Sequence, residues 1–211
     1  MRMQQIFILG SGGFAKEVFA LIKQIGSYEF SGFIDIDKKP DIIIGGKNYK
    51  VYAENYLENV DKDIRLVIGV GDPKLIEKLA NKFRNKFKFP NLIHPSVIGN
   101  FDDISKGNGN VITQNCVFTT SIKIGSFNIF NLSTTVGHDV IIGNYNVINP
   151  AVNISGGVII GNSNLIGVNA TILQYKSVGN YSTVGASSLV TKDVEDNTIV
   201  TGIPAKKFIK S

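Results

Sequence analysis

The chain has 211 residues, of which 43% are hydrophobic and 18% are charged, and its formal net charge is +5. This balance is typical of a globular protein and excludes a disordered or collagen-like chain. No apolar run approaches the ~20 residues of a membrane span, and the N-terminus lacks a signal-peptide pattern, so we expect a cytoplasmic protein without a membrane partner. A single cysteine, Cys116, cannot form an intramolecular disulfide, which fits a reducing compartment.

The first 95 residues predict alternating strands and helices. The expected strands are residues 5–9, 30–35 and 65–69, and the expected helices, recognised by their apolar spacing, are residues 14–25 and 73–87. Such alternation indicates a parallel sheet whose ligand crevice lies at the carboxyl ends of the strands. Lysines at positions 74, 78, 82 and 86 are typical of a solvated helix face, so we expect no nucleic-acid partner.

A glycine turn joins the first predicted strand to the first predicted helix. It reads Gly10-x-Gly12-x-x-Ala15, and Asp35 follows twenty residues later. This is the dinucleotide fingerprint: the glycines allow close backbone approach, the helix N-terminus attracts a phosphate, and the acid reaches a ribose hydroxyl. About 90 residues are only half of a doubly wound fold, which favours a site for one nucleotide over a nicotinamide-dependent dehydrogenase.

From residue 96 the chain follows a period of six. Every sixth residue from Ile124 to Val190 is apolar, giving twelve consecutive positions, and the series extends back through Phe118 and Ile112 and, after a two-residue slip, Ile104 and Ile98. Glycines 125, 143, 161 and 179 recur every 18 residues. Three six-residue units per coil bury one aliphatic column, so the repeat predicts a parallel β-helix of triangular cross-section with about five coils.

His138 is the candidate for proton transfer. It follows Gly137 at a repeat corner and precedes Asp139, a carboxylate that could hold one ring tautomer and raise its basicity. The alternative is a surface histidine beside an unrelated acid. The only other histidine, His94, lies at the junction of the two parts and is expected to be a structural hinge. With two histidines and one cysteine, we expect no metal site, and Cys116 has no histidine in its coil to activate it.

Four motifs occur together in this order: Gly10-Ser-Gly-Gly-Phe-Ala-Lys-Glu17, His94-Pro95-Ser96, Gly137-His138-Asp139 and Gly202-Ile-Pro-Ala-Lys206. In this combination the chain resembles the sialic-acid O-acetyltransferase and bacillosamine-type N-acetyltransferase family of sugar acyltransferases. The resemblance implies a half-Rossmann domain at residues 1–95 that binds a nucleotide sugar, a left-handed parallel β-helix at 96–200, and a C-terminal cap at 201–211. It also implies a homotrimer with acetyl-CoA as co-substrate, bound between neighbouring β-helices.

The resemblance assigns roles to individual residues. His138 would be the general base, with Asp139 increasing its basicity. The substrate-binding residues would be Gly10, Ser11, Gly12, Gly13, Lys16, Asp35, Ile36, Gly69 and Asn131. The cofactor-binding residues would be Gly156 and Gly157, whose backbone N–H groups could stabilise a tetrahedral oxyanion, together with Val168, Ala186 and Lys206 or Lys207.

Two positions depart from the family pattern. Val147 replaces a second histidine that contacts acetyl-CoA in relatives, and Phe14 replaces a histidine of the glycine loop. The expected activity is transfer of acetyl from acetyl-CoA to the amino group of a UDP- or dTDP-linked amino-deoxysugar. The alternatives are O-acetylation of a sialic acid or another sugar, and a non-catalytic trimeric scaffold.

Overall fold

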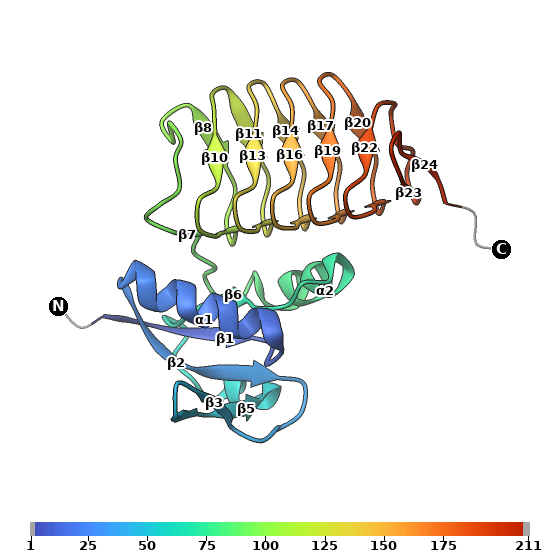
Figure 1. Cartoon of the computed structure of the whole chain (residues 1–211). Helices are drawn as coiled ribbons and strands as arrows, with labels where there is room; N and C mark the ends of the chain where they lie inside the picture. Colours follow the sequence, from blue (N-terminus) through green and yellow to red (C-terminus); the bar gives the residue numbers. More distant parts are fainter. Residues whose placement is uncertain (1–2, 209–211) are drawn as a thin grey trace.

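The computed structural model describes residues 3–208. An α/β unit formed by the N-terminal part of the chain lies beneath a β-helix formed by the remainder (Figure 1). The expected fold class is confirmed: a half-Rossmann unit precedes a left-handed parallel β-helix. None of the described helices is both long enough and apolar enough to cross a membrane.

The N-terminal unit is built on a parallel sheet with the order β5-β2-β1-β6. Its strands are β1 (Gln4–Leu9), β2 (Tyr28–Asp35), β5 (Val51–Ala53) and β6 (Arg65–Ile68). Two α-helices, α1 (Gly13–Ile25) and α2 (Pro73–Phe83), and a short 3-10 helix, η1 (Glu54–Glu58), complete it. The first strand lies at the point where the strand order reverses, which is where nucleotides bind in open α/β sheets.

The sequence did not reveal three short strands of this unit. The β5 strand, and the hairpin of β3 (Ile42–Ile44) and β4 (Lys47–Tyr49), have only three residues each. Three residues are too few to display an alternating pattern, so the pairing of β5 with β2 depends on tertiary contacts.

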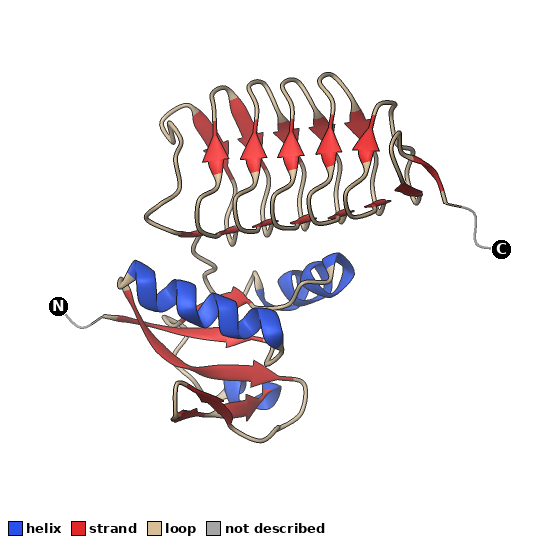
Figure 2. Ribbon diagram, viewed as in Figure 1, coloured by secondary structure: helices blue, strands red, loops and turns tan. Residues whose placement is uncertain are grey.

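Three parallel sheets form the faces of the β-helix (Figure 2). The lower sheet faces the N-terminal unit and contains β7 (Leu92–Ile93), β9 (Val111–Ile112), β12 (Ile129–Phe130), β15 (Val147–Ile148), β18 (Leu165–Ile166), β21 (Thr183–Val184), β23 (Ile199–Thr201) and the antiparallel β24 (Lys206–Lys207). The second sheet contains β10 (Val117–Phe118), β13 (Thr135–Val136), β16 (Asn153–Ile154), β19 (Thr171–Ile172) and β22 (Leu189–Val190). The third contains β8 (Ile104–Lys106), β11 (Ile122–Ile124), β14 (Ile141–Ile142), β17 (Ile159–Ile160) and β20 (Ser177–Val178).

The period-six residues fill the interior of the β-helix. All twelve positions from Ile124 to Val190 are at most 5% exposed. A buried column of asparagines runs beside them, in which Asn146 Nδ2 donates to Asn128 Oδ1 at 3.0 Å and Asn128 Nδ2 donates to Asn110 Oδ1 at 3.1 Å. The prediction for Ile98 was wrong, because its side chain is 65% exposed.

The β-helix has three corners, each named here by its position. The apical corner joins the second sheet to the third and includes residues 137–139 and 155–157. The α1-side corner joins the lower sheet to the second and includes residues 131–133 and 167–169. The α2-side corner joins the third sheet to the lower one and includes residues 125–127 and 143–145. The apical turns lie at the top of Figure 1, on the side of the β-helix away from the N-terminal unit. The β-helix with its three faces is called the prism below.

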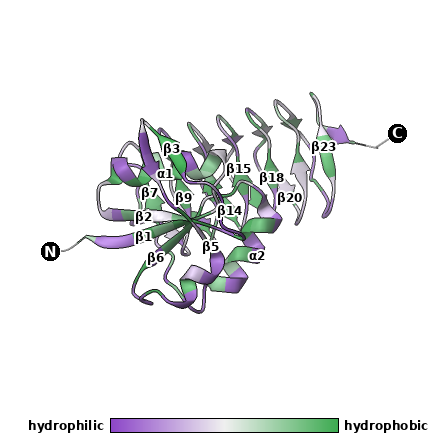
Figure 3. Ribbon diagram, turned by 90° about the horizontal axis from the view of Figure 1, so that it is seen from below, coloured by the Kyte–Doolittle hydropathy of each residue, from purple (hydrophilic) through white to green (hydrophobic). Residues whose placement is uncertain are grey.

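Both long helices fasten the N-terminal unit to the lower sheet. On the α1 side, Gln114 Nε2 donates to Gln24 Oε1 at 2.8 Å. On the α2 side, Glu77 accepts a hydrogen bond from Ser163 Oγ at 2.8 Å and one from Tyr181 OH at 3.4 Å. Side chains of both units also share one hydrophobic core. Figure 3 shows the N-terminal unit from below, in front of the coils.

The junction between the two parts is tied down by His94. Its Nδ1 accepts the Ser96 N–H at 3.0 Å and lies 2.7 Å from Ser96 Oγ, which in turn accepts the Asn115 N–H at 3.0 Å. These bonds connect the entering chain to the next coil, as expected for a structural hinge. The first strand of the lower sheet, β7, begins at Leu92.

Candidate functional site

A pocket of about 350 Å³ lies at the carboxyl ends of the N-terminal strands. The glycine turn forms one wall, and Asp35 with Ile36 forms another. At Gly10 the backbone φ is +111°, and a Cβ there would lie 2.7 Å from Val70 Cγ1. Only glycine fits this conformation and this close approach. Helix α1 begins at Gly13 with no side-chain cap, so its first N–H groups point free hydrogen-bond donors at the pocket.

Asp35 is one of three charged residues that line this pocket, with Lys39 and Glu54. Its Oδ2 accepts hydrogen bonds from Ser11 Oγ and, at 2.8 Å, from Lys39 Nζ, and its Oδ1 accepts the Ile36 N–H at 2.9 Å. Partial burial raises the pKa of Asp35, but these hydrogen bonds and the lysine charge outweigh burial, so its pKa lies below the ordinary value. The carboxylate is therefore ionised at neutral pH, and these hydrogen bonds fix its orientation in the pocket.

The pocket collects five of the predicted substrate-binding residues: Gly10, Ser11, Gly12, Asp35 and Ile36. The remaining residues predicted for this end of the molecule, Gly13, Lys16 and Gly69, do not line it. A Cβ on Gly69 would meet Ile8 and Ala15, so this glycine permits helix α1 to pack on the sheet beneath the pocket.

Further lining residues could not be recognised from the sequence. They are Lys39, Glu54, Val70, Leu75 and Leu79, contributed by segments that carry no motif. The sequence offered one indication for Lys39: it lies four residues after Asp35, a spacing that allows an ion pair between the two side chains.

His138 projects from the apical corner of the β-helix. Its Nδ1 lies 2.8 Å from Asp139 Oδ2, and the two side chains are 54% and 66% exposed. A neutral imidazole that donates from Nδ1 to this carboxylate has its Nε2 lone pair free. The expected histidine–carboxylate pair is therefore present, with its unpaired nitrogen directed away from Asp139.

The next coil supplies the surface on which the imidazole lies. A Cβ on Gly156 would lie 2.4 Å from His138 Nε2 and 2.6 Å from Cε1. Glycine at this position lets the ring rest against the backbone of the adjacent coil. Gly156 therefore sets the position of the imidazole, a role separate from its predicted cofactor contact.

The two glycines differ as donors to an oxyanion. The Gly157 N–H donates to the His138 carbonyl at 2.8 Å and is used in holding the coils together. The Gly156 N–H makes no such bond to another described residue. Of the predicted pair of N–H groups, only that of Gly156 remains free beside the imidazole.

Other predicted site residues lie at a different corner. Asn131, Val168 and Ala186 are all on the α1-side corner, separated from His138 by the width of the second sheet. The Asn131 side chain accepts the Leu132 N–H at 2.9 Å. One chain alone does not bring these residues to His138.

Lys206 and Lys207 form the exposed strand β24 in the C-terminal cap, and Lys207 Nζ lies 3.8 Å from Glu195 Oε2. Val147 is 3% exposed and packs in the core shared with the N-terminal unit. The side chain at this position is therefore apolar and lies in the core, away from the protein surface.

The lone thiol is not placed for nucleophilic chemistry. Cys116 is fully buried, and burial raises the pKa of its thiol to about 11. Across residues 3–208, no three His, Cys, Asp or Glu side chains gather in an arrangement that could hold a metal ion.

The fold and the two sites resemble those of left-handed β-helix sugar acyltransferases, in which an α/β unit precedes the β-helix. Residues 5–83 match the family described as the PglD N-terminal domain. No curated protein sequence matches the chain significantly.

Solved structures match the chain over nearly its whole length. A mutant of perosamine N-acetyltransferase from Caulobacter crescentus, in complex with CoA and GDP-perosamine, is 26% identical, with a TM-score of 0.88 and 99% of both chains covered. The acetyltransferase domain of PglB from Neisseria gonorrhoeae, in complex with acetyl coenzyme A, is 25% identical, with a TM-score of 0.88, covering 98% of this chain and 100% of that one. WeeI from Acinetobacter baumannii shares the fold at 24% identity, with a TM-score of 0.86 and coverage of 98% and 100%.

Proposed function

We propose that the protein transfers acetyl from acetyl-CoA to the amino group of a nucleotide-linked amino sugar. The observation that carries this proposal is the pairing of a single-nucleotide pocket with the apical His138–Asp139 pair. The similar structures that contain CoA and GDP-perosamine, or acetyl coenzyme A, support both halves of the pairing. UDP and dTDP are the nucleotides expected from the sequence, and the GDP sugar of the Caulobacter enzyme adds a third candidate.

In the proposed reaction His138 Nε2 removes a proton from the sugar amine as its nitrogen attacks the thioester carbonyl. Asp139, through Nδ1, holds the ring in the required tautomer and stabilises the imidazolium that forms. The Gly156 N–H donates to the oxyanion of the tetrahedral intermediate. When the C–S bond breaks, the CoA thiolate leaves and takes a proton from the imidazolium, which restores the base.

The separation of the two sites favours an assembly of more than one copy of the chain. The nucleotide pocket belongs to the unit beneath the lower sheet, whereas His138 lies at the opposite corner of the prism (Figure 1). A neighbouring copy that brings its apical corner to the α1-side corner of this chain would join the base to Asn131, Val168 and Ala186. We therefore propose a homotrimer, whose mass by light scattering would be three times the 22.9 kDa of the chain.

The test is the variant His138→Ala, assayed by CoA release with UDP-, dTDP- and GDP-linked amino sugars. Loss of a general base lowers kcat by about 10²–10⁴-fold. An unchanged circular dichroism spectrum and oligomer mass would separate this loss from misfolding. Turnover at the wild-type rate in the folded variant would refute the mechanism. Mass spectrometry of the product, compared with that from the corresponding hydroxyl sugar, distinguishes N- from O-acetylation. A wild-type protein that binds no CoA in calorimetry would instead be the non-catalytic scaffold.

A further inference from the structure

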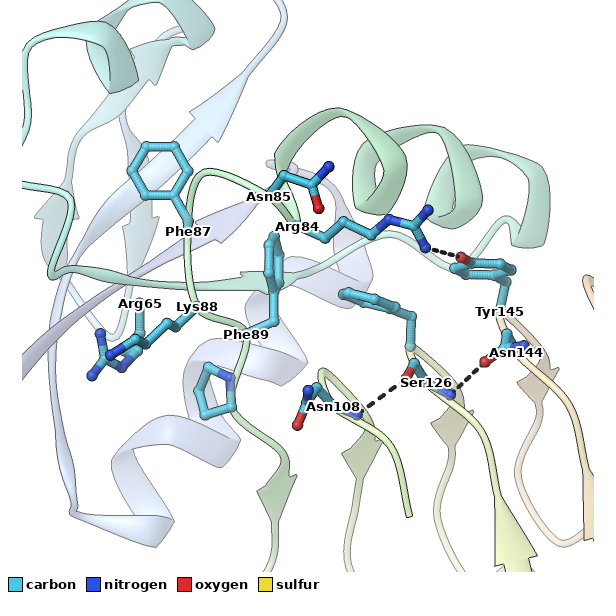
Figure 4. Close-up of a pocket in the computed structure, with 12 residues that line it drawn as sticks. Arg65, Arg84, Asn85, Phe87, Lys88, Phe89, Asn108, Ser126, Asn144 and Tyr145 are labelled. Atoms are coloured by element: carbon cyan, nitrogen blue, oxygen red, sulfur yellow. Dashed lines mark hydrogen bonds between the residues drawn. The ribbon is translucent and has the colours of Figure 1, made fainter.

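A second and larger pocket, of about 640 Å³, lies between the two domains (Figure 4). Its walls come from the start of β6, from the segment that follows α2, and from the α2-side corner of three successive coils. The volume is within the range of small-molecule sites, which is about 300–1,000 Å³. Neither the proposed acetyl transfer nor the nucleotide pocket uses any of its lining residues.

The charge of this inter-domain pocket is entirely of one sign. Arg65, Arg84 and Lys88 line it, and no carboxylate is among its lining residues. Arg84 Nη1 donates only to Tyr145 OH, at 3.3 Å, and Lys88 Nζ has no hydrogen-bond or ion-pair partner within the described part of the chain. Arg65 is the one cation with a carboxylate partner, Asp63, at 3.2 Å. Two of the three cations that line the pocket, Arg84 and Lys88, therefore have no carboxylate partner among the described residues, and this excess of positive charge favours an anion.

Aromatic rings form the floor between these cations. The rings of Phe89 and Phe127 meet edge to face at 5.2 Å, and the rings of Phe127 and Tyr145 are nearly parallel, with centroids 5.9 Å apart. Figure 4 shows Arg65 and Lys88 on one side of this group and Arg84 on the other, at Tyr145. Phe89 and Phe127 are each only 6% exposed and support the half-buried Tyr145 from below. A flat ring can contact Tyr145 while its phosphate meets an arginine or lysine.

Amide side chains complete the rim of the pocket. Asn85, Asn108 and Asn144 line it, and the amides of Asn85 and Asn108 make no hydrogen bond to another described residue. Amides offer both a donor and an acceptor, which is what the edge of a nucleobase requires.

The inter-domain pocket is separate from the proposed substrate site. Arg65 begins β6, and Val70, which lines the nucleotide pocket, follows the end of the same strand. The strand from Arg65 to Ile68 is about 10 Å long, because each residue advances a strand by ~3.3 Å. A ligand could thus occupy each pocket at the same time.

We propose that the inter-domain pocket is a second ligand site, which takes an organic phosphate carrying a flat ring, of the nucleoside phosphate class. The phosphate meets the cations and the ring lies on the aromatic floor. Because the walls come from both domains, the bound ligand stabilises the arrangement of the N-terminal unit against the β-helix.

The test counts nucleotide sites by calorimetry with UMP and GMP. The variant Gly12→Asp should abolish binding at the first site, because the added carboxylate repels a phosphate at the N-terminus of α1. The fold should tolerate this side chain, because a Cβ at Gly12 meets nothing within 4 Å. We expect two sites in the wild-type chain, and one in Gly12→Asp. The double variant Arg84→Ala/Lys88→Ala should also retain one site, the first.

In the Gly12→Asp background, Arg84→Ala and Lys88→Ala should each weaken the remaining site by about tenfold or more, as loss of a charge-assisted hydrogen bond predicts. Lys86→Ala is the matched control, since this lysine is in the same segment but does not line the pocket, and should change affinity less than twofold. Absence of a second site in the wild-type chain would overturn the proposal, as would a second site unaffected by Arg84→Ala/Lys88→Ala. Inorganic phosphate or ribose 5-phosphate binding as tightly as UMP and GMP would refute the role of the ring.

Discussion

The contact between His138 and Gly156 leads to a sharp prediction for the variant Gly156→Ala. The new Cβ would lie 2.4 Å from His138 Nε2, whereas ordinary van der Waals contact begins near 3.4 Å. The imidazole must therefore move by about 1 Å. A displacement of that size in a catalytic group can lower the rate by about 10²-fold, equivalent to ~2.7 kcal/mol in the activation free energy.

The same substitution should leave the fold intact. Gly156 does not have a left-handed φ, and the atoms that the Cβ would meet first are those of an exposed side chain that can move. Alanine also restricts the unfolded chain, which offsets part of any cost by about 0.4–1 kcal/mol. We expect a melting temperature within a few degrees of wild type, so the loss of activity would not be due to a loss of stability.

The assay is the initial rate of CoA release, with the thiol detected by a disulfide reagent, at saturating acetyl-CoA and amino sugar. Gly71→Ala is the control for a glycine-to-alanine change, because a Cβ at Gly71 meets nothing within 4 Å. A Gly156→Ala enzyme that keeps more than a third of the wild-type kcat would refute the view that this glycine positions the base.

Three further predictions concern stability and reactivity. Replacing Asn146 with alanine should lower the free energy of unfolding by about 3 kcal/mol in urea titrations, because the two hydrogen bonds that its Nδ2 donates are lost and the buried Asn164 N–H is left unpaired. The control Asn153→Ala, at an exposed position, should change the free energy of unfolding by less than 1 kcal/mol. Equal effects of the two substitutions would contradict the role of the asparagine column. Cys116, with its thiol pKa raised to about 11, should resist maleimide at pH 7.5 until urea unfolds the chain, and rapid labelling of the folded protein would contradict its burial. The lowered pKa of Asp35 contributes stability that is complete above the unfolded value of about 3.9 and is lost as pH falls through the folded value, so Asp35→Asn should flatten the decline of Tm between pH 5 and pH 3, whereas the exposed Asp37→Asn should not.

Local rules predicted much of the fold. A six-residue period can be satisfied only if each apolar member enters one interior column, and the positions from Ile124 to Val190 do so. The glycine turn and Asp35 were equally readable, because backbone conformation at Gly10 and the strand-to-helix sequence are local properties. The prediction that Ile98 lies in the interior was wrong because Ile98 pairs with Val117, the residue before the buried Phe118. The inward position therefore falls on Gly99, where a Cβ would contact Phe118 and Ile104.

The arrangement of the sites was decided by tertiary structure. The sequence by itself determined three features: the glycine turn between the first strand and helix, the adjacent His138 and Asp139, and the β-helix with three six-residue units in each coil. Each of them depends on residues that are close together in the chain. Which face of the coil the N-terminal unit covers depends on contacts such as Gln24 with Gln114 and Glu77 with Ser163, made between residues far apart and without a motif. That packing puts His138 on the far corner and joins Arg84 to Tyr145 around the inter-domain pocket, because side chains from distant segments meet only once the domains have docked.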